Sequence, residues 1–151
     1  MKEFKTIDDI LNFAINSEQE AIDFYLLLAQ RATSDDMTAI FESFVEEEMK
    51  HKERLLEVKE TGSYRIEQSA VADLHIADYV TKVKPSPDMD YQDSLILAMQ
   101  KEKAAFKLYT NLANRAPSND LRVLFESLAM EESKHKLRFE MAYDEYILRE
   151  N

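Results

Sequence analysis

The chain has 151 residues and a formal net charge of −11, from 19 Lys and Arg against 30 Asp and Glu. A single glycine and three prolines are too few for a β-sandwich or a glycine-rich nucleotide loop. The absence of cysteine excludes disulfides, thiolate zinc sites, cysteine-ligated iron–sulfur clusters and a cysteine nucleophile.

The acidic charge also disfavours nucleic acid and anionic membranes as partners. No apolar run approaches the roughly 20 residues of a membrane span, and the first residues show no secretory signal. We therefore expect one cytoplasmic domain over residues 1–151, with no nucleic-acid and no membrane partner.

The elements follow from helical periodicity and end signals. A first helix is expected over about 6–32, with Thr6 and Asp8 or Asp9 at its start, and a second to about Glu60, before Gly62. The stretch of about 62–89 predicts a crossover that runs the length of the bundle and carries a short helix or strand-like piece. A third helix begins near 88–90 and ends near 116–118, and a fourth runs almost to the C-terminus.

An internal repeat groups these helices into two hairpins. Between Glu18 and Arg54, 18 of 37 residues are identical to the residues 84 positions later. Register-keeping identities such as Arg31/Arg115 and Lys50/Lys134 indicate duplication of a helical hairpin rather than general amphipathic similarity. The predicted fold is all-α: a four-helix bundle made of helix pairs at about 6–61 and 90–149, joined by the crossover.

Charged residues interrupt the predicted core. The core stripe of each helix is apolar except near its middle, where four glutamates and two histidines stand: Glu18, Glu48, His51, Glu102, Glu132 and His135. Buried carboxylates are costly unless they are paired or bind a cation, and no Lys or Arg lies on these stripes. A pair of divalent ions would balance the four carboxylates, with both histidines as neutral ligands.

The spacing of these residues supports the same interpretation. Residues at i and i+3 share a helix face, so Glu48 with His51, and Glu132 with His135, each present a carboxylate and an imidazole to one point. One Glu from each of two helices plus a Glu-x-x-His from each of the other two is the ligand pattern of carboxylate-bridged di-iron bundles. The sequence predicts these six residues as ligands of two iron ions, with manganese or zinc as alternatives.

Neighbouring residues allow two interpretations. Glu47 and Glu131 either reach the site or lie on solvated helix surface. Tyr25 and Tyr109 are either aromatic core or donors of a hydrogen bond to a ligand carboxylate. His75, in the crossover, has no repeat partner and is expected to be structural or exposed. Apolar residues off the stripes, such as Phe13, Phe24 and Leu27, either cover the crossover or form a dimer face.

Two motif pairs carry a family resemblance: Glu18-x-x-Ala21-x-x-x-Tyr25 with Glu48-x-x-His51, and Glu102-x-x-Ala105-x-x-x-Tyr109 with Glu132-x-x-His135. From about Ile10 to Ala142 the chain resembles the ferritin-like superfamily, and within it the rubrerythrin-like branch. The resemblance implies a four-helix bundle with a long crossover and a non-haem di-iron centre that reacts with peroxide or dioxygen.

The chain departs from that branch in two respects. It lacks the four cysteines of the rubredoxin-type domain that full-length rubrerythrins carry. It also lacks their additional third-helix glutamate, since Ala98 or Met99 and Ala105 or Phe106 stand one turn from Glu102. The remaining ligand set is similar to the ferroxidase centre of bacterioferritins. Only 16 residues follow His135, which leaves little room for the fifth helix of cage-forming ferritins.

Three functions remain as hypotheses. The first is a di-iron oxidoreductase that reduces hydrogen peroxide or reacts with dioxygen, with electrons from an external donor such as a rubredoxin-like protein. The metal pair itself would be the catalytic group, and the protein a homodimer. The second is a ferroxidase or iron-handling protein of the ferritin type. The third is a helical interaction module with a structural metal site.

Overall fold

Four long α-helices make up most of the part of the chain that the structure, a computed structural model, describes: residues 6–32, 34–61, 79 and 89–150. They are α1 (Ile7–Arg31), α2 (Asp35–Thr61), α4 (Tyr91–Asn114) and α5 (Asn119–Glu150). The all-α prediction is confirmed, and the predicted helix ends agree to within a few residues. The helix or strand-like piece expected in the crossover falls on residues outside the described ones.

Local side chains fix the helix starts. The Thr6 hydroxyl accepts a hydrogen bond from the Asp9 backbone N–H, and the Asp9 carboxylate accepts one from the Thr6 N–H, which forms a capping box. Asp90 caps α4 by accepting from the Asp93 N–H at 2.7 Å. These caps satisfy backbone donors that the first helical turn leaves without partners.

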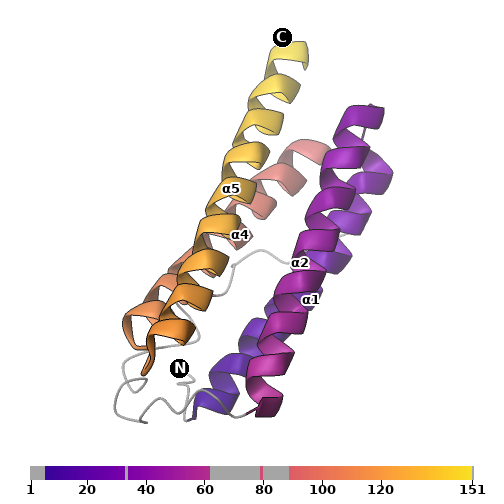
Figure 1. Cartoon of the computed structure of the whole chain (residues 1–151). Coiled ribbons are helices and arrows are strands. Elements are labelled where there is room, and N and C mark those ends of the chain that lie inside the picture. Colours follow the sequence, from indigo (N-terminus) through magenta and orange to yellow (C-terminus); the bar gives the residue numbers. More distant parts are fainter. Residues whose placement is uncertain (1–5, 33, 62–78, 80–88, 151) are drawn as a thin grey trace.

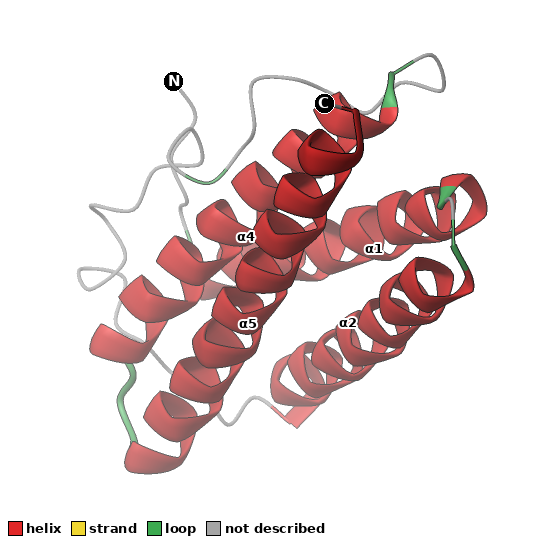
Figure 2. Cartoon of the chain, turned by 90° about the horizontal axis from the view of Figure 1, so that it is seen from above, coloured by secondary structure: helices red, strands yellow, loops and turns green. Residues whose placement is uncertain are grey.

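The helices pair as two antiparallel hairpins, α1 with α2 and α4 with α5 (Figures 1 and 2). Tyr91 at the start of α4 packs against Phe41 near the start of α2 and against Tyr146 near the end of α5, with ring centroids 6.4 and 5.3 Å apart. Since α2 and α4 begin at the same end of the bundle, the chain between them joins opposite ends. This is the crossover topology that the sequence predicts. No described helix is long and apolar enough to cross a membrane.

The apolar core is divided into two clusters, and both contain residues of all four helices. One cluster surrounds Leu11, Leu55, Leu112 and Phe125, near the start of α1. The other surrounds Leu28, Phe41, Leu95 and Phe139, near its end. The middle of the bundle, between the clusters, is where each core stripe carries its charged residues.

Candidate metal centre

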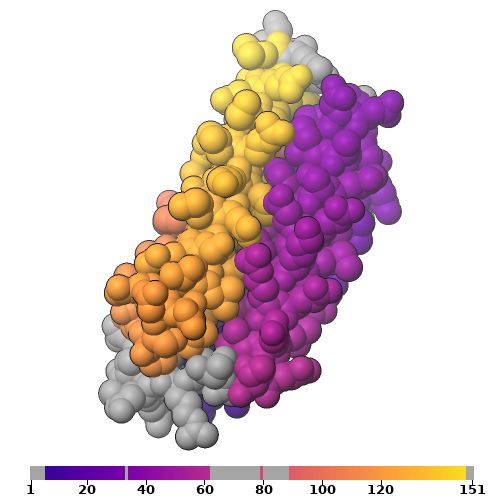
Figure 3. Space-filling model, viewed as in Figure 1, coloured from indigo at the N-terminus to yellow at the C-terminus, as the bar shows by residue number. Residues whose placement is uncertain are grey.

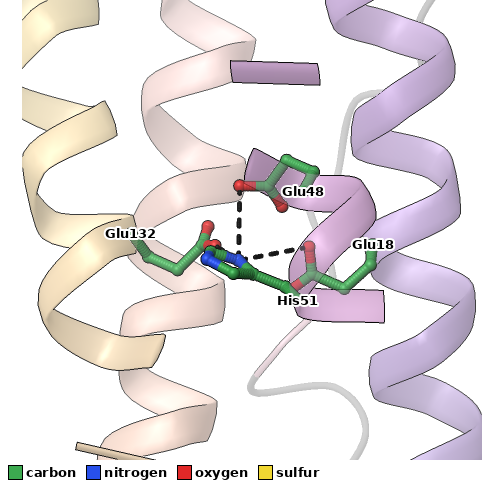
Figure 4. A group of neighbouring side chains, drawn as sticks. All are labelled: Glu18, Glu48, His51 and Glu132. Carbon is green, nitrogen blue, oxygen red and sulfur yellow. Dashed lines mark ion pairs between the residues drawn. The ribbon is translucent and has the colours of Figure 1, made fainter. Parts of the chain in front are cut away.

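Six of the seven buried polar or charged residues in the described part of the chain are the predicted ligands. Glu18 comes from α1, Glu102 from α4, and one Glu-x-x-His pair each from α2 and α5. None of the six is more than 2% exposed. Figure 4 shows Glu18, Glu48 and Glu132 directed toward His51 from three different helices.

The six side chains form two overlapping groups of four. One group is Glu18, Glu48, His51 and Glu132, the other Glu48, Glu102, Glu132 and His135, and in each the ligand atoms lie within 4.8 Å of one another. Glu48 and Glu132 belong to both groups. If each group held one metal ion, Glu48 and Glu132 would bridge the two ions, whereas Glu18 and Glu102 would each bind one.

The histidines face the centre through Nδ1. His51 Nδ1 lies 2.8 Å from Glu132 Oε1 and 3.7 Å from the nearest carboxylate oxygens of Glu18 and Glu48. His135 Nδ1 lies 2.9 Å from Glu48 Oε1 and 3.6 Å from Glu102 Oε1. Each histidine thus reaches the bridging carboxylate of the opposite hairpin.

Buried atoms without hydrogen-bond partners show that the site suits cations. Each of the six residues has one such atom: an oxygen of each glutamate and Nδ1 of each histidine. Orphaned buried polar atoms are costly, and native proteins almost always satisfy them. Oxygen and imidazole nitrogen suit iron, manganese and zinc, so the residues present fit a pair of such ions. Glu18 and His51 would hold one ion, Glu102 and His135 the other, and Glu48 and Glu132 both.

The charges of the cluster shift its proton affinities. Burial, and then the neighbouring carboxylates, raise the pKa of Glu48 and of Glu132 well above the ordinary range. Burial lowers the pKa of His135, but the adjacent carboxylates of Glu102 and Glu48 outweigh it and raise the value to about 11. The pKa of His51 is raised in the same way, chiefly by Glu18. Without metal, protons therefore take the place of cations.

Two tyrosines hold the non-bridging carboxylates. Tyr25 on α1 donates a hydrogen bond to Glu102 on α4, and Tyr109 on α4 donates one to Glu18 on α1. Of the two interpretations that the sequence left open, the structure shows both, since each ring is also fully buried in the core. Burial and the nearby carboxylates raise the pKa of both tyrosines, so both keep the proton that they donate.

Glu47 and Glu131 reach the site from outside. Glu47 on α2 pairs with Nε2 of His135 on α5, and Glu131 on α5 pairs with Nε2 of His51 on α2. A carboxylate only accepts, so Nε2 carries the proton and, in the neutral imidazole, Nδ1 is free to bind a metal ion. The sequence left these residues undecided, although their identity across the repeat was a usable signal. His75 lies outside the described residues.

The first prediction concerns the outer carboxylates. Glu47→Ala or Glu131→Ala should weaken binding of Co²⁺ or Zn²⁺ by about 10- to 100-fold, because the paired histidine loses the acceptor that orients it. Glu47→Gln keeps an oxygen acceptor and should lose less. The matched control is Glu46→Ala, on the exposed neighbour. Equal affinities for Glu47→Ala and Glu46→Ala would show that the outer pairs do not orient the ligands.

The second prediction concerns protons. Groups with a raised pKa hold protons at pH 7 in the metal-free protein, and a metal ion must displace them. Metal uptake at pH 7 should therefore release protons, and affinity should rise with pH. Calorimetry in buffers of different ionisation enthalpy measures the release. Binding with no proton release would mean that the cluster is already deprotonated without metal.

Comparisons with known proteins bear on the family and the fold of this chain. The family model described as Rubrerythrin matches residues 9–91 and 93–151. A solved structure, "Hypothetical Protein Pfu-1136390-001 From Pyrococcus furiosus", is similar with a TM-score of 0.69 and 24% identity, over 89% of this chain and 86% of that one. That likeness supports the fold alone. A search of the curated proteins gives no match. On its motifs, its buried ligand set and the family match, the chain belongs to the rubrerythrin family of ferritin-like proteins.

Proposed function

We propose that the protein is a non-haem di-iron oxidoreductase that reduces hydrogen peroxide with electrons from an external donor. The observation that carries the proposal is the pair of overlapping Glu/His groups, buried at the centre of a rubrerythrin-family bundle. An iron pair held there would supply the two electrons that reduction of a peroxide requires.

The side chains of this protein would set the geometry of that reaction. Tyr25 and Tyr109 fix the non-bridging carboxylates by hydrogen bonds, and Glu47 and Glu131 fix the ring orientation of the histidines. Preorganised ligands of this kind keep a site in one arrangement while its charge changes. The chain has no cysteine to ligate an electron-transfer iron, so we propose a separate rubredoxin-like protein as donor.

A ferroxidase is the second candidate. The ligand set is symmetric, with one glutamate and one histidine at each end and two shared glutamates, as expected for a centre that oxidises iron as its substrate. A helical interaction module with a structural metal is the third, and redox-inert binding of zinc would favour it.

We also propose a homodimer. Val123, Met130 and Leu137 recur at seven-residue intervals on α5, and each is more than half exposed. A regular apolar stripe on an outer helix face favours pairing with a second helix. Light scattering showing a large cage instead would favour the ferroxidase.

The third prediction tests the reaction. Iron-loaded, reduced protein mixed anaerobically with hydrogen peroxide should be oxidised at least about tenfold faster than with dioxygen, as followed by stopped-flow absorbance. Oxidation should stop after one turnover unless a donor is added. His51→Ala and His135→Ala should slow the reaction, with Glu46→Ala as the control. Equal or faster oxidation by dioxygen, with iron deposited on continued addition, would identify a ferroxidase.

A further inference from the structure

A cavity of about 730 Å³ lies between α1 and α4 and reaches the candidate metal centre. All four site glutamates line it, and neither histidine does. The cavity therefore approaches the centre from the side opposite the histidines. On the α2–α5 face, by contrast, the side chains of those helices meet along a continuous seam (Figure 3), across which the outer pairs Glu47–His135 and Glu131–His51 lie.

The walls of this cavity are mostly apolar. Phe13, Phe24 and Leu27 line it from α1, Leu108 from α4, and the buried Tyr79 from the chain between the hairpins. Three small side chains leave the space between the two helices open: Ala21, Ala104 and Ala105.

The charged residues at the cavity other than the four site glutamates have partners. Lys101 Nζ lies 3.8 Å from the exposed Glu20, and Asp23 accepts a hydrogen bond from Gln19 at 3.0 Å. A funnel for metal cations would present unpaired carboxylates at its entrance. Here one acid lies beside a lysine and the other accepts from an amide, so the entrance is not a ring of free carboxylates. The apolar walls then favour a ligand with an uncharged organic group.

The size of the cavity exceeds what hydrogen peroxide needs. A water molecule occupies about 30 Å³ of liquid, and hydrogen peroxide is of similar size. Most of the volume would hold an organic group, which gains from leaving water for an apolar wall.

We propose that the cavity binds organic hydroperoxides, with the hydroperoxide group at the four glutamates and the alkyl or aryl group against Phe13, Phe24 and Leu27. The proposal rests on the proposed function and names a substrate class for the same centre. The O–O bond breaks, one oxygen leaves as water and the other remains in the alcohol ROH. Two electrons come from the reduced iron pair, the external donor restores them, and two protons come from solvent.

A binding experiment tests the cavity without any turnover. Zinc-loaded protein, which is redox-inert, is titrated with cumyl alcohol, the product of cumene hydroperoxide, and followed by calorimetry and methyl NMR. We expect saturable binding that perturbs Ala105 and Leu27. Ala105→Leu, which fills the cavity, and Leu27→Glu, which charges its wall, should each weaken binding by at least about tenfold. Ala39→Leu, on the exposed face of α2, is the control that leaves binding unchanged. Circular dichroism verifies that each variant is folded.

A rate comparison separates this inference from the proposed function. In iron-loaded protein, Ala105→Leu should lower the ratio of the cumene hydroperoxide rate to the hydrogen peroxide rate by at least about tenfold. Oxidation by hydrogen peroxide with no binding of cumyl alcohol would overturn the cavity proposal and leave the proposed function standing. Binding of the alcohol with no oxidation by either peroxide would overturn the proposed function, and with it the assignment of hydroperoxides as substrates.

Discussion

Four carboxylates buried at the centre of the bundle, in two overlapping groups whose ligand atoms lie within 4.8 Å, are the constraint on which the rest of this structure depends. Each is at most 2% exposed, and within the described residues only histidines form ion pairs with them. Moving a carboxylate out of water without a counter-charge costs several kcal/mol even after relaxation. In the metal-free protein, the raised pKa of Glu48 and Glu132 indicates that bound protons neutralise part of the carboxylate charge. Two divalent cations would neutralise that charge in their place. The charged layer separates two apolar clusters, and these clusters hold the four helices together on either side of it.

The repeated hairpin makes the tyrosine–glutamate and outer histidine–glutamate contacts of the centre occur twice. Tyr25 donates to Glu102, and the residues 84 positions away repeat the contact as Tyr109 to Glu18. His51 pairs with Glu131, and the same shift gives His135 with Glu47. Such reciprocity is the signature of two like units related by a two-fold axis, as in an isologous dimer. All four contacts cross between hairpins, the tyrosines from α1 to α4 and the histidines from α2 to α5. The polar centre is thus also what joins the two halves.

Periodicity predicted which residues are buried, but not their partners. Glu18 and Glu102 stand on apolar stripes, so a spacing of three and four residues was enough to place them at the core. The partner of Glu47 could not be read in this way, because its nearest histidine along α2 is His51, whereas the structure pairs it with His135. Spacing along one helix fixes a face and not the neighbouring helix or its register. The sequence did not predict the cavity, for a related reason. Ala21 and Ala105 have the spacing of ordinary core positions, and only the structure shows that the helices that carry them lie opposite each other.

The two sides of the centre differ, and the difference bears on function. On the α2–α5 side, each histidine contacts a carboxylate that reaches the surface: Glu47 is 50% and Glu131 is 35% exposed. These contacts hold the orientation of the two histidine rings. On the α1–α4 side, the tyrosine hydroxyls and glutamates face a cavity. A purely structural metal site is closed by its ligands, whereas an open approach to the carboxylates is what a site needs if small molecules are to reach it. Because the repeat gives both metal positions the same ligand types, neither is built for a distinct role. That symmetry alone would serve a ferroxidase equally well, so peroxide is the favoured partner in the proposed function because of the rubrerythrin-family match.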